Sequence, residues 1–175
     1  MGAWGYKLYQ CDDAKDFRDA FKSVKNFPFD EDQFLAYFKD DCGYLKGEDQ
    51  TIQWLVLYDQ FHQYAIDAPQ TYQRVKEIIE RDEDIAYHRD LDMSARDLAK
   101  RSGHLQALWQ SWQSPPVKPK KRKLIKPDQP YVMEGGEVYI YPTENGWPRM
   151  SRYDWSAAGF FDPGKKGKPV PEVNL

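Results

Sequence analysis

The chain has 175 residues, enough for one domain or a small pair, and a chain of this length needs no metal or disulfide to hold a core. Hydrophobic residues make up 41% and charged residues 30%, which indicates a globular protein and excludes a disordered polymer. The two cysteines, Cys11 and Cys42, form no CxxC motif, so we expect two free thiols in a reducing compartment.

Charge is distributed unevenly along the chain. Residues 1–113 carry 14 Lys and Arg against 21 Asp and Glu, a net charge of −7, whereas residues 114–175 carry 11 against 7, a net charge of +4. Binding to a phosphate backbone draws on clustered cations, so the acidic front part disfavours nucleic acid as a partner. An acidic surface is instead complementary to a basic surface on a partner protein.

No segment has the pattern of a signal peptide or a membrane span. The N-terminus lacks a basic region followed by an apolar run, and no apolar stretch approaches the roughly 18 residues that cross a bilayer. Tyr6 stands where a myristoylation signal has Ser or Thr. We therefore expect a cytoplasmic protein with no membrane partner.

Three helices are predicted in the first 64 residues. The first covers residues 12–25, where apolar side chains recur at the spacing of one helix face and Asp12 or Asp13 is available as N-cap. A break at Phe27-Pro28-Phe29 separates it from a second helix over residues 30–39. The third, over residues 48–64, is apolar nearly all round, which predicts a central position among the others.

Two further helices are predicted before residue 113. One begins at Pro69 and ends near the acidic residues 81–84, and a short turn or helical piece follows it at residues 85–89. The last begins with Ser94 as N-cap, has Asp97 in a weak capping box, and carries apolar residues as far as Trp112. Together they predict a mainly α fold, a bundle of about five helices in a domain over residues 1–113.

Composition changes abruptly after the predicted bundle. Residues 114–130, SPPVKPKKRKLIKPDQP, contain five prolines and six basic residues, which predicts an extended, solvated linker. Residues 131–175 place β-branched and aromatic residues around Gly135-Gly136 and Asn145-Gly146, which predicts a small antiparallel β unit and a C-terminal tail. The overall class is then α+β.

The run KPKKRK within the linker has two possible roles besides solvation. Such a cluster can hold phosphate, but this one lacks the interleaved aromatic residues of a single-strand binding surface, so nucleic acid is disfavoured. Alternatively, the basic linker lies along the acidic bundle of the same chain.

The sequence contains no recognisable catalytic or metal-binding motif. His62, His88 and His104 lie on different predicted elements, without the spacing that aims two imidazoles at one metal. The enzymatic alternative rests on His62 as a general base beside Asp59, three residues away on the same helix face. We predict no catalytic residue, no metal and no cofactor.

Carboxylates gather in four short stretches, the last of which is Asp82-Glu83-Asp84. A helix has only four free N–H groups at its N-terminus, so these carboxylates exceed what capping requires. The structural alternative is a solvated, acidic helix face. The functional prediction is a partner-binding surface made of Asp12, Asp13, Asp16, Asp19, Asp30, Glu31, Asp32, Asp40 and Asp41.

The opening MGAWGYKLYQCDDAKDFRDAF resembles the start of a widespread bacterial family of unknown function, whose members begin Met-Gly-Ala-Trp-Gly or Met-Gly-Thr-Trp-Gly. The stretches IQWLVLYDQFHQYA, VKEIIERDEDI and LAKRSGHLQALWQSWQSPP are also similar to segments of that family, and the resemblance extends to about residue 142. The family's L-x-x-D-D-x-A-x-D-x-x-D pattern is matched by Leu8, Asp12, Asp13, Ala14, Asp16 and Asp19, with the Asp-Asp pair displaced by one residue.

Some members of this family resemble immunity proteins of polymorphic toxin systems. The resemblance therefore implies an immunity or antitoxin-type protein that neutralises a cognate bacterial toxin with a basic surface, and it implies no catalytic residues. Two alternatives stay open: a defence or counter-defence adaptor, and a small hydrolase or nucleotide-modifying enzyme that uses His62. We expect Gly2 and Gly5 to let the backbone bend so that Trp4 anchors the N-terminus on the bundle.

Overall fold

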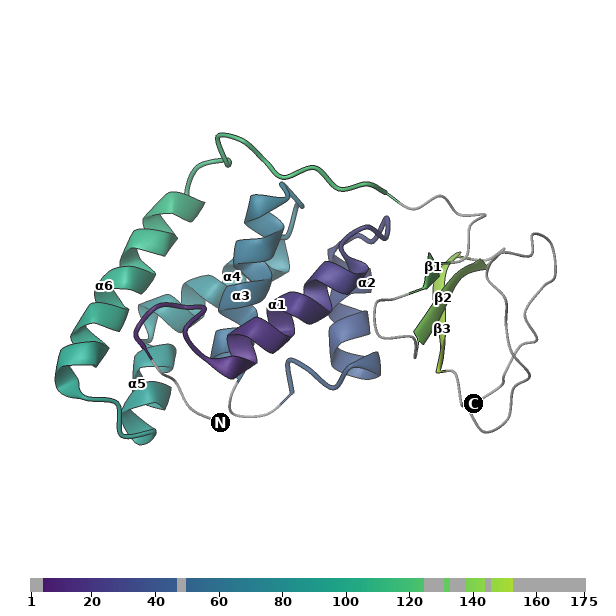
Figure 1. The fold of residues 1–175 in the computed structure, drawn as a ribbon. Helices are drawn as coiled ribbons and strands as arrows, with labels where there is room; N and C mark the ends of the chain where they lie inside the picture. The colour runs from purple at the N-terminus through teal and green to yellow at the C-terminus, as the bar shows by residue number, and fades with distance from the viewer. Residues whose placement is uncertain (1–4, 47–49, 125–130, 133–137, 144–145, 153–175) are drawn as a thin grey trace. The chain divides into compact units, whose positions relative to one another are not determined.

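The computed structural model of the chain describes residues 5–46, 50–124, 131–132, 138–143 and 146–152. The chain divides into two compact units, the first ending at Leu124 and the second beginning at Ile125. The sequence alone placed the end of the helical domain at residue 113. In the first unit the described residues are mainly helical, as predicted (Figure 1).

Six α-helices and one π-helical turn, η1, are present among the described residues of the first unit. The predicted piece at residues 85–89 is a helix of eight residues, so the bundle has one helix more than expected. Helix α2 continues without interruption into η1. The bounds are α1 (Asp12–Val24), α2 (Glu31–Ala36), η1 (Tyr37–Asp41), α3 (Gln50–Gln63), α4 (Pro69–Glu80), α5 (Glu83–Asp90) and α6 (Ala95–Trp112).

Phenylalanine rings from α1, α2, η1 and α3 build the centre of the bundle. The ring of Phe21 on α1 lies 5.5 Å from that of Phe34 on α2 and 5.8 Å from that of Phe61 on α3, measured between centroids. Phe17 lies 4.8 Å from Phe38 of η1. All five side chains are fully buried. Each contributes about 1.5–3 kcal/mol by leaving water, so this cluster contributes substantially to stability.

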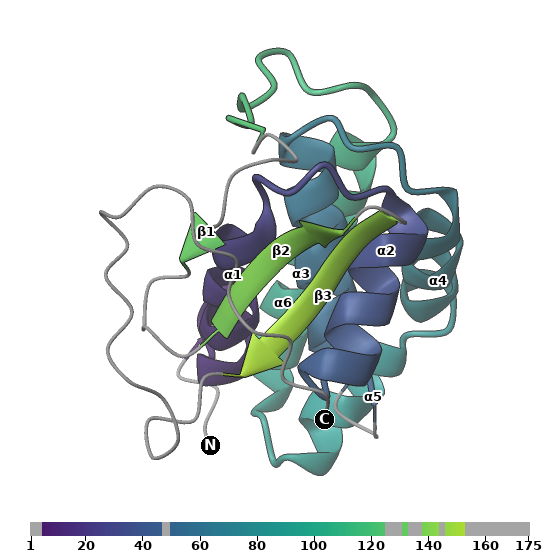
Figure 2. The same cartoon turned by 90° about the vertical axis from the view of Figure 1, so that its right-hand side faces the viewer.

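Helix α3 is the central helix, which confirms the expectation from its apolar sequence. Nine of its fourteen residues are buried. Figure 2 shows α3 between α1 and α4, so its sides are covered by other helices. A helix in this position has little room for polar side chains, and the few that it carries must find partners inside the protein.

Two helix starts are capped by side chains. Asp30 caps α2 in a reciprocal capping box with Gln33, with bonds of 2.9 and 3.0 Å. Ser94 caps α6 as predicted, because its Oγ accepts from the backbone N–H of Asp97 at 3.2 Å. The return bond differs from the predicted box, since the Ser94 hydroxyl donates to the Asp97 carboxylate at 2.9 Å. Each cap contributes about 1 kcal/mol.

Residues 114–124, which we call the strap, follow α6 in an extended course and belong to the helical unit (Figure 1). The backbone N–H of Lys120 donates to the carbonyl of Gln63 at 2.7 Å, and that of Lys123 donates to Asn26 Oδ1 at 3.2 Å. The strap is thus bonded to the end of α3 and to the chain just after α1. The first part of the predicted linker is thus extended, as expected, but it is bound to the helical bundle.

The described strands of the second unit are β1 (Tyr131–Val132), β2 (Val138–Thr143) and β3 (Gly146–Arg152). They pair antiparallel in the order β1-β2-β3, with an irregularity between Tyr141 and Thr143. The predicted turn residues Gly135-Gly136 and Asn145, and the tail from residue 153, lie outside the described residues.

Candidate functional site

Three of the predicted carboxylates form a row on the face of α1 that points away from the core. Asp12, Asp16 and Asp19 are spaced by four and three residues, so they share one side of the helix, opposite the buried Phe17 and Phe21. Asp16 and Asp19 are exposed and Asp12 is half-buried. We call these three residues the acidic stripe. The N-cap position of α1 is Cys11, not Asp12 or Asp13.

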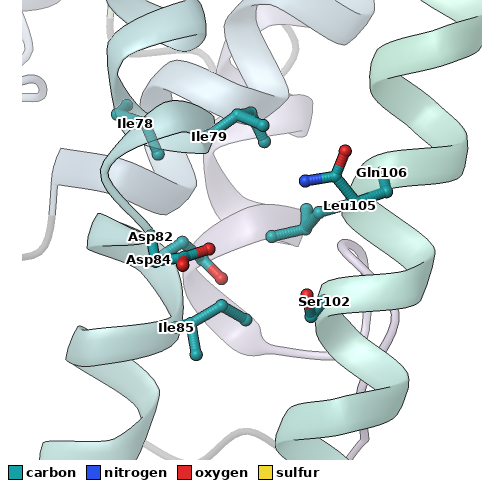
Figure 3. Close-up of a pocket in the computed structure, with 8 residues that line it drawn as sticks. All are labelled: Ile78, Ile79, Asp82, Asp84, Ile85, Ser102, Leu105 and Gln106. Carbon is teal, nitrogen blue, oxygen red and sulfur yellow. The ribbon is translucent and has the colours of Figure 1, made fainter.

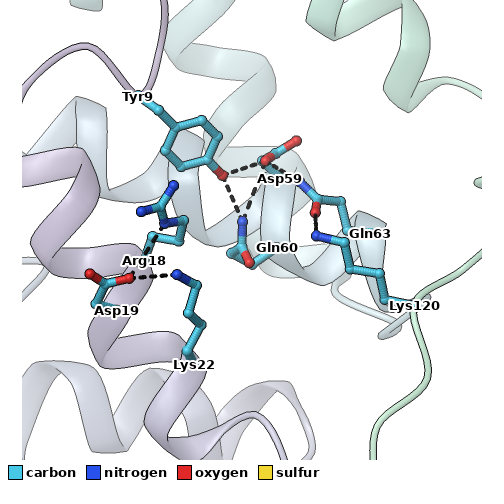
Figure 4. A network of polar contacts seen from close by, with 8 residues as sticks. All are labelled: Tyr9, Arg18, Asp19, Lys22, Asp59, Gln60, Gln63 and Lys120. Atoms are coloured by element: carbon cyan, nitrogen blue, oxygen red, sulfur yellow. Dashed lines mark hydrogen bonds and ion pairs between the residues drawn. The ribbon is translucent and has the colours of Figure 1, made fainter.

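Basic residues border the acidic stripe on one flank. The ammonium of Lys22 donates to Asp19 at 2.7 Å, and Arg18 Nε lies 3.5 Å from the same oxygen (Figure 4). The bond from Lys22, with the nearby charge of Arg18, holds the pKa of the Asp19 carboxyl below its ordinary value. Because this pair is exposed, it contributes little to stability, and a partner can exchange it for its own cation.

The opposite flank of the stripe lies near Tyr44, which follows η1 in the chain. The ring of Tyr44 lies 5.0 Å from that of Phe17, which holds it against α1. Burial raises the pKa of Tyr44, and the nearby charges of Asp16 and Asp13 add to this effect. Asp40 of η1 is exposed, with its carboxylate 3.9 Å from Lys46 Nζ.

Asp30, Glu31 and Asp32 were predicted to bind a partner together, but the structure separates them. Asp30 and Asp32 are exposed, whereas Glu31 is only 6% exposed. The Glu31 carboxylate accepts the backbone N–H of Gln70 at 3.1 Å, and the N–H and hydroxyl of Thr71 at 2.6 and 2.7 Å. Glu31 therefore caps α4 and joins it to α2, and it is removed from the exposed acidic set.

Several predicted residues lie outside the described part of the chain, namely Gly2, Trp4 and the side chain of Asp41. Gly5 is described, and a Cβ added there would lie 2.6 Å from Cδ of Gln10. The carboxamide of Gln10 fills that space and accepts from the backbone N–H of Lys7 at 3.1 Å. A glycine at position 5 thus allows the N-terminal loop to close on itself.

Of the acidic residues 82–84, Asp84 is the one that is buried. The Asp84 carboxylate accepts from Arg101 Nε and Nη2 at 2.5 and 2.8 Å, and both side chains are almost completely buried. His88 is also buried and its Nδ1 lies 2.9 Å from the carbonyl oxygen of Asp84. Beside them lies a cavity of about 10 Å³ between α4, α5 and α6, the size of one water molecule (Figure 3).

His62 lines an open hollow of about 480 Å³ where the ends of α3 and α6 meet the start of α4. Its Nε2 lies 2.8 Å from the carbonyl oxygen of Ser114, the first residue of the strap. Tyr58, Tyr72 and Trp112 form aromatic walls, with the Tyr58 ring 5.3 Å from Trp112 and 5.6 Å from Tyr72. Burial raises the pKa of Tyr58 to about 12.

Asp59 has its own buried network and forms no dyad with His62. Its carboxylate accepts from the hydroxyl of Tyr9 and from Gln63 Nε2 at 2.6 Å (Figure 4). It also accepts from Trp112 Nε1 at 3.3 Å. Burial, and next the negative charge of Asp59, raise the pKa of Tyr9 well above its ordinary value. The enzymatic alternative therefore loses the pairing on which it was predicted.

No group of three or more His, Cys, Asp or Glu side chains in the described residues is arranged to hold a metal ion. None of the described helices combines the length and apolarity needed to cross a bilayer.

No protein-family model matches the sequence, and searches of curated proteins and of solved structures find no similar chain. The resemblance of the opening residues to a bacterial family thus stays a prediction.

Proposed function

We propose that this protein acts by binding another protein, as an immunity or antitoxin-type inhibitor that neutralises a cognate bacterial toxin with a basic surface. The observation that carries the proposal is the acidic stripe, three carboxylates on the outward face of α1. In this proposal the protein works in the cytoplasm, and the predicted β unit after residue 130 is a separate part.

Two of the three carboxylates of the acidic stripe are not needed to start α1. Carboxylates stabilise a helix within its first turn, and Asp16 and Asp19 lie beyond that turn. Like charges at a spacing of four residues destabilise a helix by about 0.2–0.5 kcal/mol per pair. A basic partner removes this repulsion, so the arrangement that is unfavourable in the free protein favours the complex.

The same geometry explains how such a protein inhibits without catalysis. The apolar face of α1 is packed on the phenylalanine core, so the helix is a rigid support for its outward carboxylates. A rigid acidic row attracts a basic surface over distance and accelerates association at low salt. Covering the cationic substrate groove of a toxin blocks its reaction by occupancy.

The proposal is tested with the product of a neighbouring reading frame as the candidate toxin. Co-expression with the intact chain is expected to restore growth of cells that the toxin arrests. The double variant Asp16→Lys and Asp19→Lys is expected to lose that rescue and to weaken binding by at least about tenfold, largely through slower association.

The matched control is Glu80→Lys with Asp90→Lys, which changes the net charge equally at exposed positions on α4 and α5. We expect this control to retain rescue. Equal rescue by the two double variants, or equal affinity in calorimetry, would place the interface elsewhere and refute the role of the acidic stripe.

A further inference from the structure

The strap carries the densest positive charge of the described chain. Lys120, Lys121, Arg122 and Lys123 are consecutive, and no Asp or Glu occurs between residues 98 and 127. An acidic bundle is the nearest available counter-charge, so the contacts of these cations decide whether they serve the bundle or an external ligand.

The strap is attached to the bundle through neutral groups. Arg122 Nη1 donates to the carbonyl oxygen of Phe27 at 3.4 Å, and Lys120 Nζ donates to the side-chain oxygen of Gln63. The two backbone bonds, from Lys120 and Lys123, end on a carbonyl and on an amide oxygen. Among the described residues, none of the ion pairs between basic groups and carboxylates involves a cation of the strap.

At the end of the strap, the side chains of Lys120 and Arg122 are bonded to the bundle, and Lys121 and Lys123 alternate with them. Arg122 is half-buried and bonded to the bundle, whereas Lys121 and Lys123 on either side of it are exposed. An extended chain turns successive side chains to opposite sides, which explains this pattern. Arg122 and Lys120 therefore hold the strap, and Lys121 and Lys123 present their charges to solvent.

The fold adds an aromatic ring and a further cation beside the strap. Tyr64, just after α3, has the ammonium of Lys120 at 5.7 Å from its ring centroid and that of Lys25 at 5.5 Å. Lys25 is distant in the sequence and reaches this place through α1. The sequence alone disfavoured nucleic acid because the basic run contains no aromatic residue. The fold places the half-buried ring of Tyr64 beside the run, where it also packs 5.9 Å from the core ring of Phe21.

We propose that the strap, with Lys25 and Tyr64, binds the phosphate backbone of single-stranded nucleic acid. Lys121 and Lys123 face solvent two residues apart, which is about 6.6 Å in an extended peptide. Neighbouring phosphates along an extended single strand are separated by a similar distance, roughly 6–7 Å, so the two cations match successive phosphates, whereas carboxylates on a protein surface have no such period. This inference does not depend on the acidic stripe or on a toxin.

The test uses the full chain and a fluorescein-labelled single-stranded RNA of twelve nucleotides in fluorescence anisotropy, at a series of KCl concentrations. Removing one phosphate contact is expected to lower the slope of log K against log salt by about 0.7. The double variant Lys121→Gln and Lys123→Gln is therefore expected to lower it by about 1.4 and to weaken binding at least tenfold at low salt.

The control Lys76→Gln with Lys100→Gln removes the same charge from partly exposed positions on α4 and α6, and it is expected to bind RNA as the unchanged protein does. Polyglutamate serves as a competitor that carries carboxylates without phosphates, and weak competition is expected. Absence of RNA binding at low salt, equal loss in the control variant, or displacement by polyglutamate as effective as by unlabelled RNA would overturn the proposal.

Discussion

Glu31 is predicted to be a major stabilising residue although it lies in a cluster of exposed carboxylates. Its two carboxylate oxygens accept three hydrogen bonds from the first turn of α4, two of them from backbone N–H groups that have no partner within that helix. The substitution Glu31→Gln keeps the shape of the side chain and removes the charge and one acceptor oxygen. Whichever way the amide is turned, its NH₂ group then faces a donor of Gln70 or Thr71.

The cost of this substitution follows from the groups left without partners. A buried N–H without an acceptor costs about 1–3 kcal/mol. Removing a negative charge from a helix N-terminus costs a further 0.3–1 kcal/mol or so, rising to about 2 in partly buried geometry. Because Glu31 is 6% exposed, solvent screens these effects weakly, and we expect a loss of about 2–4 kcal/mol in the free energy of unfolding.

Urea unfolding at 25 °C, followed by far-UV circular dichroism, measures this loss. With a slope of about 2 kcal/mol/M, the midpoint is expected to fall by about 1–2 M. Asp32→Asn is the matched control, since Asp32 is exposed and accepts only from the side chain of Gln70, at 2.5 Å; a change under about 0.5 kcal/mol is expected. If both variants unfold at the same urea concentration, the reasoning about Glu31 is wrong.

Three further predictions concern α5 and α6. Arg101→Met leaves the buried Asp84 carboxylate without its guanidinium and is expected to cost about 3–5 kcal/mol in urea unfolding, whereas a loss below 1 kcal/mol would contradict the pairing. Burial, with the nearby charge of Arg101, lowers the pKa of His88. As the pH falls, the imidazole is therefore protonated in the unfolded chain before it is protonated in the folded chain. Stability is therefore expected to fall as the pH decreases below about 6.5, and the fall to be smaller in His88→Asn; an identical pH profile of unfolding would refute this. Gly103 is exposed within α6 and a Cβ there meets open space, so Gly103→Ala is expected to raise the unfolding free energy by about 0.5–1 kcal/mol, and a lower melting temperature would contradict it.

The parts of the fold that the sequence predicted depend on neighbours three or four residues apart. The buried face of α1, including Phe17 and Phe21, follows from helical periodicity alone. The cap at Ser94 and the central place of α3 follow from equally local signals, a hydroxyl before an apolar run and a helix without a polar face. Helix α5 was underestimated because eight residues with few apolar positions give a weak periodic signal.

The parts that the sequence did not predict depend on partners far along the chain. Glu31 has the same local surroundings as Asp32, and what separates their roles is Thr71, forty residues away. Asp59 likewise looked like a partner for His62, but the N-terminal loop and α6 bring one donor each, Tyr9 and Trp112, to its carboxylate. A short-range pattern identifies a carboxylate, and only the tertiary contacts decide whether it is buried.

The described part of the chain exposes both negative and positive side chains to solvent, the former on α1 and the latter on the strap. If the strap served to neutralise the bundle, its cations would contact carboxylates, because opposite charges attract most strongly when they are in direct contact. Here carbonyl and amide oxygens hold the strap, and Lys22 and Arg18 occupy only one end of the acidic stripe. The protein thus keeps an acidic row on α1 and a basic row on the strap at the same time. Two surfaces of opposite charge that do not pair with each other fit the two proposed ligands, one basic and one acidic, better than they fit a single ligand.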